Sequence, residues 1–533
     1  MELTTGWTGR TACALQAALR LSNESFAEHL GIGVRTVAGW HQKPTLRPKS
    51  EMQQLLDTAL EQAPPAVKER FAKLASRPAQ TKVIPQANTE PEQDGTAADT
   101  ELRLSADPNI GAALDWLDQH AEWEPGTARR RVASQLARLD VSELRDRGHR
   151  RGRVNQRHIA DALGQYYGDR TEDHGRYTVR YDADSEAMTS ILTCPRWLDL
   201  ECPLIATNDR LSVTSMAVGT DMPLNEQAAE RAVQRLAETL ALEVRFFDMP
   251  VYRLLGIDVR QGDISGSASV ARFVDYALTM DLLEGELVDS LAVGISPERG
   301  QLPLRDRYLP DVRSVLDVGD RLCAGGALAL CAIARPASPH RGDADYLLLV
   351  QERSGHVVNA ARRLAVIPKA FHQPLVDLRA EAQIGATLRR EMEEELFGRE
   401  DLDNTITHQR RADPMHPSRL SEPMRWLMEG PDRLRMECTG FGLNLVSGNY
   451  EFASLIVIED EEFWTRYGGQ IEANWESWTL RQYSSIDGEL LTELIRDVAW
   501  SNEGLFALLQ GLRRLRQIGG NRVNLPTIEW EIL

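Results

Sequence analysis

The chain has 533 residues, which predicts several domains at roughly 150 residues each. Hydrophobic residues make up 42% of the chain and charged residues 26%, as in an ordinary globular protein. The net charge of −18 argues against nucleic acid as a partner of the whole surface. Apolar runs such as residues 325–334 are too short to cross a bilayer, and the first ten residues lack the layout of a signal peptide. Six cysteines without a CxxC pair argue against a disulfide framework or a zinc ribbon, so we expect a cytoplasmic protein without a membrane partner.

Basic residues are concentrated in two segments of this acidic chain. The window from residue 29 to residue 50 contains no acid, and residues 143–158 carry six arginines. Local basic faces on an acidic body are typical of a regulator with a small DNA-binding head. The arginines at 143–158 fit a second phosphate-contacting patch or a solvated helix face, and we prefer the solvated face. Only six of the 61 basic residues are lysine, a bias that fits a GC-rich bacterial genome.

Five regions follow one another along the chain. The first region, 1–76, is helical over residues 10–75, and helical periodicity returns over 109–168 in a region that extends to 176. Between them, residues 77–108 are rich in Pro, Gln, Thr and acid, which predicts a flexible linker. Short strand-like segments and one amphipathic helix predict an α/β module of unknown role over 177–320. Residues 321–533 contain further strands around an acidic helix, then helical segments, and the last ten residues could add an edge strand. We therefore expect a multidomain chain with an all-α head, a helical region and an α/β or α+β body.

A helix-turn-helix is expected near the N-terminus. Residues 22–42, SNESFAEHLGIGVRTVAGWHQ, contain a glycine, Gly31, that can take the positive φ of a tight turn. Val37 and Trp40 are three residues apart and would share the inner face of the second helix. The segment resembles the lambda-repressor-like helix-turn-helix family, also called Cro/C1 or XRE. The resemblance implies binding to double-stranded DNA, with a homodimer expected from operator symmetry. The alternative is a helical hairpin that packs against a partner protein.

The resemblance also identifies candidate DNA contacts. Arg35 is the best candidate for reading a guanine, because it lies near the exposed N-terminal part of the second helix. Basic and amide side chains around the motif would contact DNA phosphates. Such contacts position the protein on the DNA without specifying the base sequence. The expected DNA-binding residues are Asn23, Val34, Arg35, Thr36, Ala38, Gly39, Lys43, Arg47 and Lys49.

The acidic helix contains residues 389–398, RREMEEELFG. In an α-helix Glu391, Glu394 and Glu395 lie at i, i+3 and i+4, so their carboxylates would converge on one face. Oxygen ligands at this density suit Mg²⁺ or Mn²⁺. The opposite face carries an apolar stripe of Leu388, Met392 and Leu396. We therefore expect a helix that is buried on one side and acidic on the other.

The pattern Arg-Glu-x-x-Glu-Glu, after two strands and a loop, resembles the Nudix box. The resemblance covers about residues 325–485 and implies an α/β/α sandwich. It implies that Mg²⁺, bound by Glu391, Glu394 and Glu395, sits on the diphosphate of a nucleoside diphosphate derivative. Arg390 would be the structural arginine, pointing away from the acidic face. If the domain is active, Glu394 and Glu395 would be its catalytic residues.

The loop before this helix departs from the family's pattern. It reads IPKAFHQPLVDLRAEAQIG and has no glycine pair where the family has one. The family's upstream glutamate corresponds to Ala382, with Glu381 one residue out of register. Lys369 and His372 are candidates for a different anion-binding site in this loop. Glu451 could supply the additional late glutamate that Nudix enzymes often use.

Together these patterns predict a bacterial DNA-binding transcriptional regulator whose degenerate Nudix-like domain senses a nucleotide-like ligand. A Mg²⁺-dependent Nudix hydrolase of a nucleoside diphosphate derivative remains an alternative, as does a non-catalytic protein-interaction scaffold. The acidic helix could also be a solvated charge run without a site.

Overall fold

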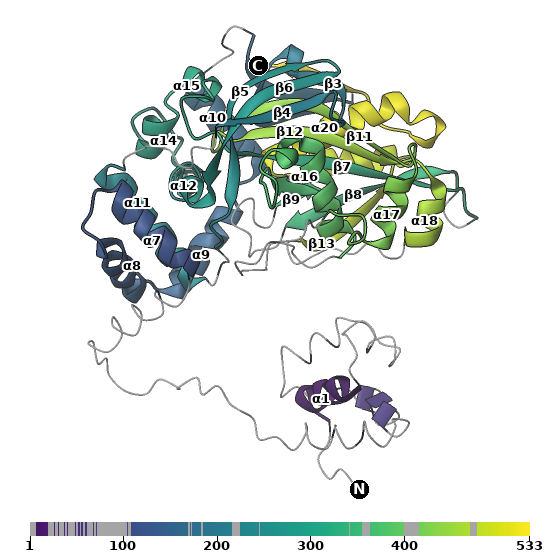
Figure 1. The fold of residues 1–533 in the computed structure, drawn as a ribbon, viewed down its shortest axis with the longest axis horizontal. Helices are drawn as coiled ribbons and strands as arrows, with labels where there is room; N and C mark the ends of the chain where they lie inside the picture. The colour runs from purple at the N-terminus through teal and green to yellow at the C-terminus, as the bar shows by residue number, and fades with distance from the viewer. Residues whose placement is uncertain are drawn as a thin grey trace. The chain divides into compact units, whose positions relative to one another are not determined.

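In a computed structural model the chain folds into two compact units, residues 1–92 and 93–533 (Figure 1). In the second unit the structure describes residue 104 and residues 108–533, apart from 169–170, 172, 183–184, 216–223, 243, 245, 340–341, 354–362, 399–414 and 469–476. In the first unit it describes residues 7–19 and the positions 26, 30, 37, 40, 48, 52, 53, 55, 56, 59, 60, 68 and 71.

The N-terminal unit has its own hydrophobic core. Helix α1 (Gly9–Leu19) contributes Ala12, Leu15 and Ala18 to it. Phe26 and Trp40 meet edge to face with their ring centroids 6.5 Å apart, and Val37 is fully buried. Val37 and Trp40 are therefore buried residues, as the helical spacing predicted.

The second unit is built on an eleven-stranded mixed sheet. Its main path runs β13-β8-β7-β12-β11-β2-β1-β14, while β10 pairs with β7, β3 with β11 and β9 with β8. β7 and β12 are parallel, and the other pairings described in this sheet are antiparallel. The strands are β1 (Gly175–Tyr181), β2 (Ser185–Thr193), β3 (Leu198–Pro203), β7 (Gly325–Arg335), β8 (Asp345–Arg353), β9 (Leu364–Val366), β10 (Lys369–Phe371), β11 (Leu434–Asn444), β12 (Tyr450–Ile458), β13 (Ser477–Ser484) and β14 (Ile528–Ile532).

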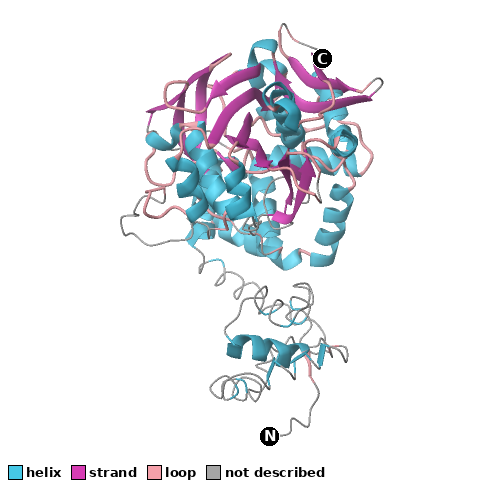
Figure 2. Ribbon diagram, turned by 90° about the vertical axis from the view of Figure 1, so that its right-hand side faces the viewer, coloured by secondary structure: helices cyan, strands magenta, loops and turns pink. Residues whose placement is uncertain are grey.

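Helices cover both faces of the central strands, which explains why β7 is buried along its whole length. Side chains of a strand point alternately to the two faces. Ala327, Ala329 and Cys331 pack in the same core as α16 (Ile384–Glu391), whereas Leu328 and Leu330 pack in the core of α20 (Asn502–Ile518). In Figure 2 helices lie on both sides of the strands.

A smaller sheet and a set of helices complete the second unit. The sheet has the order β4-β6-β5, formed by Asp209–Ser215, Asp263–Arg272 and Pro250–Arg260. The other α-helices described in this unit are α7 (Pro108–His120), α8 (Thr127–Arg138), α9 (Val141–Gly152), α10 (Gln156–Tyr167), α11 (Glu226–Ala241), α12 (Phe273–Ala277), α13 (Leu282–Ala292), α14 (Pro303–Tyr308), α15 (Val312–Leu316), α17 (Glu422–Glu429), α18 (Glu461–Tyr467) and α19 (Gly488–Arg496). No helix among the described residues is long and apolar enough to span a bilayer.

The mixed α/β architecture that the sequence predicted is confirmed. The regions 109–176, 177–320 and 321–533 lie together in one compact unit. The reason is strand pairing over long sequence distances, because β1, β2 and β3 join the sheet formed by the C-terminal half. The expected edge strand at the end of the chain is β14, which pairs with β1.

Candidate functional site

The acidic helix is buried on all sides. α16 ends at Glu391 and continues into a single π-helical turn, Met392–Leu396. The apolar stripe of Leu388, Met392 and Leu396 is buried as expected, but Glu393 and Glu395 are also at most 1% exposed. The expectation of an exposed acidic face is therefore wrong, and so is the interpretation of the helix as a solvated charge run.

The carboxylates of this helix bind groups of the protein itself. Arg390 Nη2 lies 3.0 Å from Glu391 Oε1, which corrects the expectation that Arg390 points away from the carboxylates. Glu395 Oε2 accepts a hydrogen bond from the Lys369 backbone N–H at 2.8 Å, and Glu393 Oε1 accepts one from the Ser421 N–H at 2.9 Å. Glu395 is thus directed to β10 and Glu393 to the residue before α17, while Glu391 binds its neighbour in the same helix.

Among the described residues, the carboxylates of this helix do not form a ready-made magnesium site. No three His, Cys, Asp or Glu side chains within the described ranges are grouped so that they could bind a metal ion. The ligands expected from the Nudix resemblance are Glu391, Glu394 and Glu395, and the first and last of them already have partners. The π turn contributes to the difference, because it alters the i, i+3, i+4 spacing on which the expectation depended.

The loop before the helix is fixed by two charged side chains. Arg390 Nη1 donates to the Gln373 carbonyl oxygen at 2.9 Å. Glu381 accepts from three consecutive backbone N–H groups of the loop, those of Leu375, Val376 and Asp377, at 2.5, 3.0 and 2.8 Å. Glu381 therefore organises this loop although it lies one residue out of the family's register.

Lys369, on β10, lies at the centre of a buried polar cluster. It is the only lysine between residues 93 and 533, where every other basic side chain apart from histidine is arginine. Its Nζ atom lies 2.5 Å from Oε1 of Glu503, in the first turn of α20, and the Lys369 side chain is 14% exposed. Glu503 Oε2 accepts a hydrogen bond of 3.3 Å from Asn444 Nδ2 at the end of β11. We call Lys369, Glu395, Asn444, Glu451 and Glu503 the Lys369 cluster.

Glu451 and Glu503 in the Lys369 cluster have opposite protonation states at neutral pH. Burial raises the pKa of Glu451 to about 8, and the charge of Glu503 adds to this effect while Lys369 opposes it. Burial also opposes ionisation of Glu503, but the charge and hydrogen bond of Lys369 outweigh it, so the pKa of Glu503 lies below its ordinary value. Near neutral pH the cluster therefore contains an ionised Glu503 and a protonated Glu451, which can donate a hydrogen bond.

A glycine at the start of β7 leaves room for this cluster. A Cβ atom added at Gly326 would lie 3.4 Å from Glu451 Oε2 and 2.7 Å from the Ala370 carbonyl oxygen. Gly326 pairs with Glu451 in the parallel ladder and with Phe371 in the antiparallel one. The Gly-Gly pair at 325–326 was the available signal in the sequence, although it begins β7 and does not precede the acidic helix directly.

His372 does not contribute a positive charge to the anion site that the sequence suggested. His372 is 1% exposed, and its Nδ1 lies 3.0 Å from the Tyr450 hydroxyl. The centroid of its ring lies 4.5 Å from that of the Tyr252 ring, with the two rings tilted against each other. Burial lowers the pKa of His372 to about 3, and the charge of Arg390 adds to this effect. His372 is therefore neutral at physiological pH, while the charge of Lys369 is paired with Glu503.

The structure describes the second basic segment, residues 143–158, but not the expected DNA contacts near the first. The expected DNA contacts, Asn23, Val34, Arg35, Thr36, Ala38, Gly39, Lys43, Arg47 and Lys49, lie outside the described residues and stay predictions. In the segment 143–158, Arg147 pairs with Glu238 and Arg151 with Asp289, each at 2.5 Å. The remaining arginines of that segment, Arg145, Arg150, Arg153 and Arg157, are exposed.

Comparison with known protein families and curated proteins identifies no relative of this chain. No family model matches the chain, and no curated protein sequence matches it. The functional assignment therefore depends on the geometry of the Lys369 cluster and on the basic segments.

Proposed function

We propose that this protein is a DNA-binding transcriptional regulator whose second unit contains a non-hydrolytic, Nudix-like sensor of a nucleotide-like anion. The observation that carries the proposal is the Lys369 cluster. A charged group in a protein interior costs several kcal/mol unless it is paired, and apolar side chains of similar volume often serve stability as well or better. Groups with strongly shifted pKa values also gather at functional sites more often than elsewhere. A largely buried lysine, three buried glutamates and a buried asparagine are therefore better explained by binding than by folding.

The surroundings of the cluster support a Nudix-like ancestry. α16, which carries Arg-Glu-x-x-Glu-Glu, lies on one face of the sheet, and α20 lies on the other face. This is the α/β/α arrangement that the resemblance implies. Two of the three carboxylates that would bind magnesium in a hydrolase, Glu391 and Glu395, bind protein groups here. The proposal therefore includes ligand binding but not hydrolysis.

A mechanism for sensing follows from the Lys369–Glu503 pair. An incoming phosphate would compete with Glu503 for the ammonium group of Lys369, while protonated Glu451 could donate a hydrogen bond to a phosphate oxygen. Glu503 lies in the first turn of α20, so its release would change the position of that helix relative to β10. A ligand that prefers one of two such states changes their populations and thereby the affinity for DNA.

The DNA-binding part of the proposal is supported by the N-terminal unit. It is compact by itself and has a buried aromatic core, and the acid-free window at 29–50 lies within it. A chain of net charge −18 needs such a local basic surface to approach DNA. Homodimerisation is part of the proposal because operators of this class are commonly two-fold symmetric.

Sequencing of the genomic DNA that co-purifies with the full chain tests the DNA-binding part. We expect enriched sites that share a sequence, and weaker binding to them for Arg35→Ala. The control is Arg299→Ala, which alters an exposed arginine in the second unit. Absence of enriched sites, or equal and salt-independent binding by Arg35→Ala, would contradict this part of the proposal.

Isothermal titration of the full chain with nucleoside diphosphates and triphosphates in EDTA tests the sensing part. We expect binding of at least one of them to wild type, a loss of roughly tenfold or more for Lys369→Met, and partial retention for Lys369→Arg. Circular dichroism establishes that each variant is folded. Binding that is unaffected by Lys369→Met in a folded variant would place the ligand elsewhere.

A phosphate-release assay with Mg²⁺ and the same nucleotides tests the hydrolase alternative. Turnover by wild type that is lost in Glu394→Gln and Glu395→Gln would establish hydrolysis and overturn the non-hydrolytic assignment. Binding in EDTA without turnover in Mg²⁺ is the outcome that we expect.

A further inference from the structure

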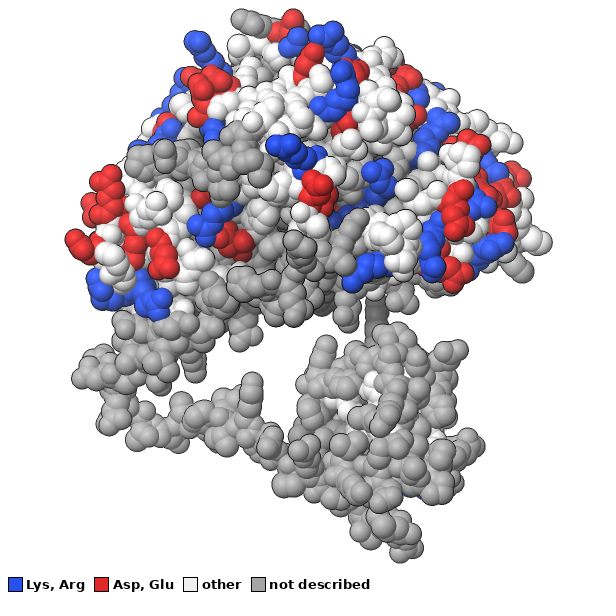
Figure 3. All heavy atoms as spheres, in the orientation of Figure 1, with Lys and Arg blue, Asp and Glu red and all other residues white. Residues whose placement is uncertain are grey.

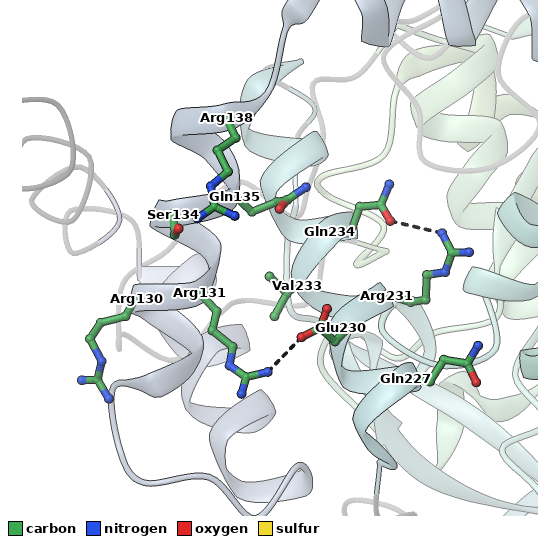
Figure 4. A pocket seen from close by; sticks show the side chains of 10 residues that line it. All are labelled: Arg130, Arg131, Ser134, Gln135, Arg138, Gln227, Glu230, Arg231, Val233 and Gln234. Carbon is green, nitrogen blue, oxygen red and sulfur yellow. Dashed lines mark hydrogen bonds and ion pairs between the residues drawn. The ribbon is translucent and has the colours of Figure 1, made fainter. Parts of the chain in front are cut away.

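α8 and α11 pack against each other and leave a groove of about 520 Å³ along their exposed side (Figure 4). Its lining consists of four arginines, three glutamines, a serine, one glutamate and a single apolar residue, Val233. Figure 4 shows that the two helices contribute side chains from opposite walls, with Arg131 reaching towards Glu230 across the groove. The groove is thus an almost entirely polar surface.

The lining has a net positive charge of three, from four arginines and one glutamate. The glutamate, Glu230, pairs with Arg131 at 3.1 Å, and the Arg131 guanidinium also lies 4.1 Å from the centroid of the Trp123 ring. The other three arginines supply the excess charge. Among them, Arg231 hydrogen-bonds Gln234 at 3.2 Å, and Arg130 hydrogen-bonds the Thr127 hydroxyl at 2.9 Å. Neither partner is charged, so both guanidinium groups keep their charge available to an anion.

Arg130 and Arg138 are spaced along one face of α8. They lie eight residues apart with Ser134 between them, all three are exposed, and the rise of an α-helix places them about 12 Å apart along its axis. The segment 126–158 contains ten arginines and three acids, in a chain whose net charge is −18. Figure 3 shows basic side chains at the lower left, where α8 lies in Figure 1. An extended polyanion could therefore contact several charges of this segment.

The chemistry of the groove favours nucleic acid over protein as its partner. Protein interfaces usually contain a buried aromatic or aliphatic residue at their centre, and Val233 alone does not provide one. Arginine, glutamine and serine side chains donate hydrogen bonds to phosphate oxygens without reading base sequence. We propose that this groove binds the phosphate backbone of double-stranded DNA, as a second, sequence-independent contact outside the N-terminal unit. The inference rests on the proposed function as a DNA-binding regulator.

The test measures DNA affinity of the full chain as a function of salt, with a site from the genomic experiment and with a random duplex of equal length. The groove variant is Arg130→Glu with Arg138→Glu. The matched control is Arg299→Glu with Arg313→Glu, which changes the net charge equally at exposed positions outside the groove. Each lost phosphate contact reduces the slope of log K against log salt by about 0.9. We expect the groove variant to lose about 2 in slope and at least about tenfold in affinity for both duplexes.

Three outcomes separate the inference from the proposal on which it rests. If the groove variant and the control variant bind both duplexes equally well, the groove inference is wrong while the regulator proposal stands. If Arg35→Ala has no effect but the groove variant loses binding, the head is not the reading element and the groove contact stands. If wild type binds no duplex but its groove binds polyglutamate, in a manner lost in the groove variant, the partner is an acidic protein and both proposals fail.

Discussion

At the scale of single residues, Glu451 and Glu503 illustrate how one lysine separates two similar side chains. Both carboxyl groups are buried, but only Glu503 contacts the ammonium group of Lys369. Burial without a direct cation raises the pKa of Glu451 to about 8, whereas the pKa of Glu503 lies below its ordinary value. Because the pKa of Glu451 is raised in the folded state, the free energy of unfolding falls as the pH rises towards 8.

Glu451→Gln is expected to flatten part of the pH dependence of stability. Between the ordinary pKa of 4.5 and the folded pKa of about 8, the folded state retains a proton that the unfolded state has lost. The contribution of Glu451 to the free energy of unfolding is therefore complete below pH 4.5 and is lost as the pH rises towards 8. We expect the variant to gain on the order of 2 kcal/mol or more, relative to wild type, between pH 5 and pH 8.5 in urea unfolding. Parallel profiles for wild type, Glu451→Gln and the exposed control Glu298→Gln would contradict this expectation.

Lys369→Met is expected to destabilise the protein by about 3 to 5 kcal/mol, because it leaves Glu503 buried without its cation. Adding Glu503→Gln to the same chain removes the uncompensated charge and should recover at least about 1 kcal/mol in a double-mutant cycle. The control is Lys68→Met at an exposed position. Equal unfolding free energies for the two lysine variants would show that the ion pair contributes nothing.

Lys369 was a candidate from sequence, but its partner Glu503 was not. The two residues are 134 positions apart, and an acid in the first turn of a helix is so common that it gives no indication of a site. The one usable signal was the isolation of Lys369 in a region of arginines, since a lone buried lysine requires a buried acid nearby. Local patterns predicted which residue is unusual, but not what it contacts.

At the scale of elements, the acidic helix shows why a sequence pattern can predict packing better than chemistry. The apolar stripe of Leu388, Met392 and Leu396 depends only on helical periodicity, and it is buried as expected. The destinations of the carboxylates depend on β10 and on the start of α17, which pack against the helix from other parts of the chain. The π turn at Met392–Leu396 has no signal in the sequence that we could identify.

Magnesium is expected to leave the thermal unfolding of the protein unchanged. A metal ion at this helix would compete with Arg390 for Glu391 and with the Lys369 amide for Glu395. An ion that bound the folded state at 100 times its Kd would add about 2.7 kcal/mol of stability. We therefore expect Tm values in millimolar MgCl₂ and in NaCl of equal ionic strength to agree within about 1 °C. A rise of several degrees in Mg²⁺ that disappears in Glu394→Gln with Glu395→Gln would establish a metal site.

At the scale of the whole molecule, the large sheet joins segments from opposite ends of the second unit. β14 covers the outer edge of β1, with Tyr177 opposite Ile532 and Tyr181 opposite Ile528. The alternation in β14 was readable from the sequence as a possible edge strand. Its partner was not, because no local pattern specifies which of several strands a distant segment will join.

Ile528→Ala with Ile532→Ala is expected to cost about 2 kcal/mol or more for each buried side chain removed. Both isoleucines are buried, whereas Glu529 and Glu531 in the same strand are exposed. Glu529→Ala with Glu531→Ala is thus a matched control on the opposite face of β14. The Arg180–Glu531 pair, at 3.8 Å and largely exposed, should contribute little, so the control should lie within about 0.5 kcal/mol of wild type in urea unfolding. Equal effects of the two double variants would show that β14 does not pack as described.

The pairing of β1 with β14 also has a consequence for synthesis in the cell. Tyr177 and Ile532 are 355 residues apart (532 − 177), and a ribosome adds roughly 5 to 20 residues per second. The outer edge of β1 therefore emerges about 20 to 70 s before the strand that covers it has been translated. An uncovered strand edge can pair with other chains. We expect nascent chains of this protein to require shielding by a chaperone during that interval, and slow codons between β1 and β14 to lower the yield of folded protein.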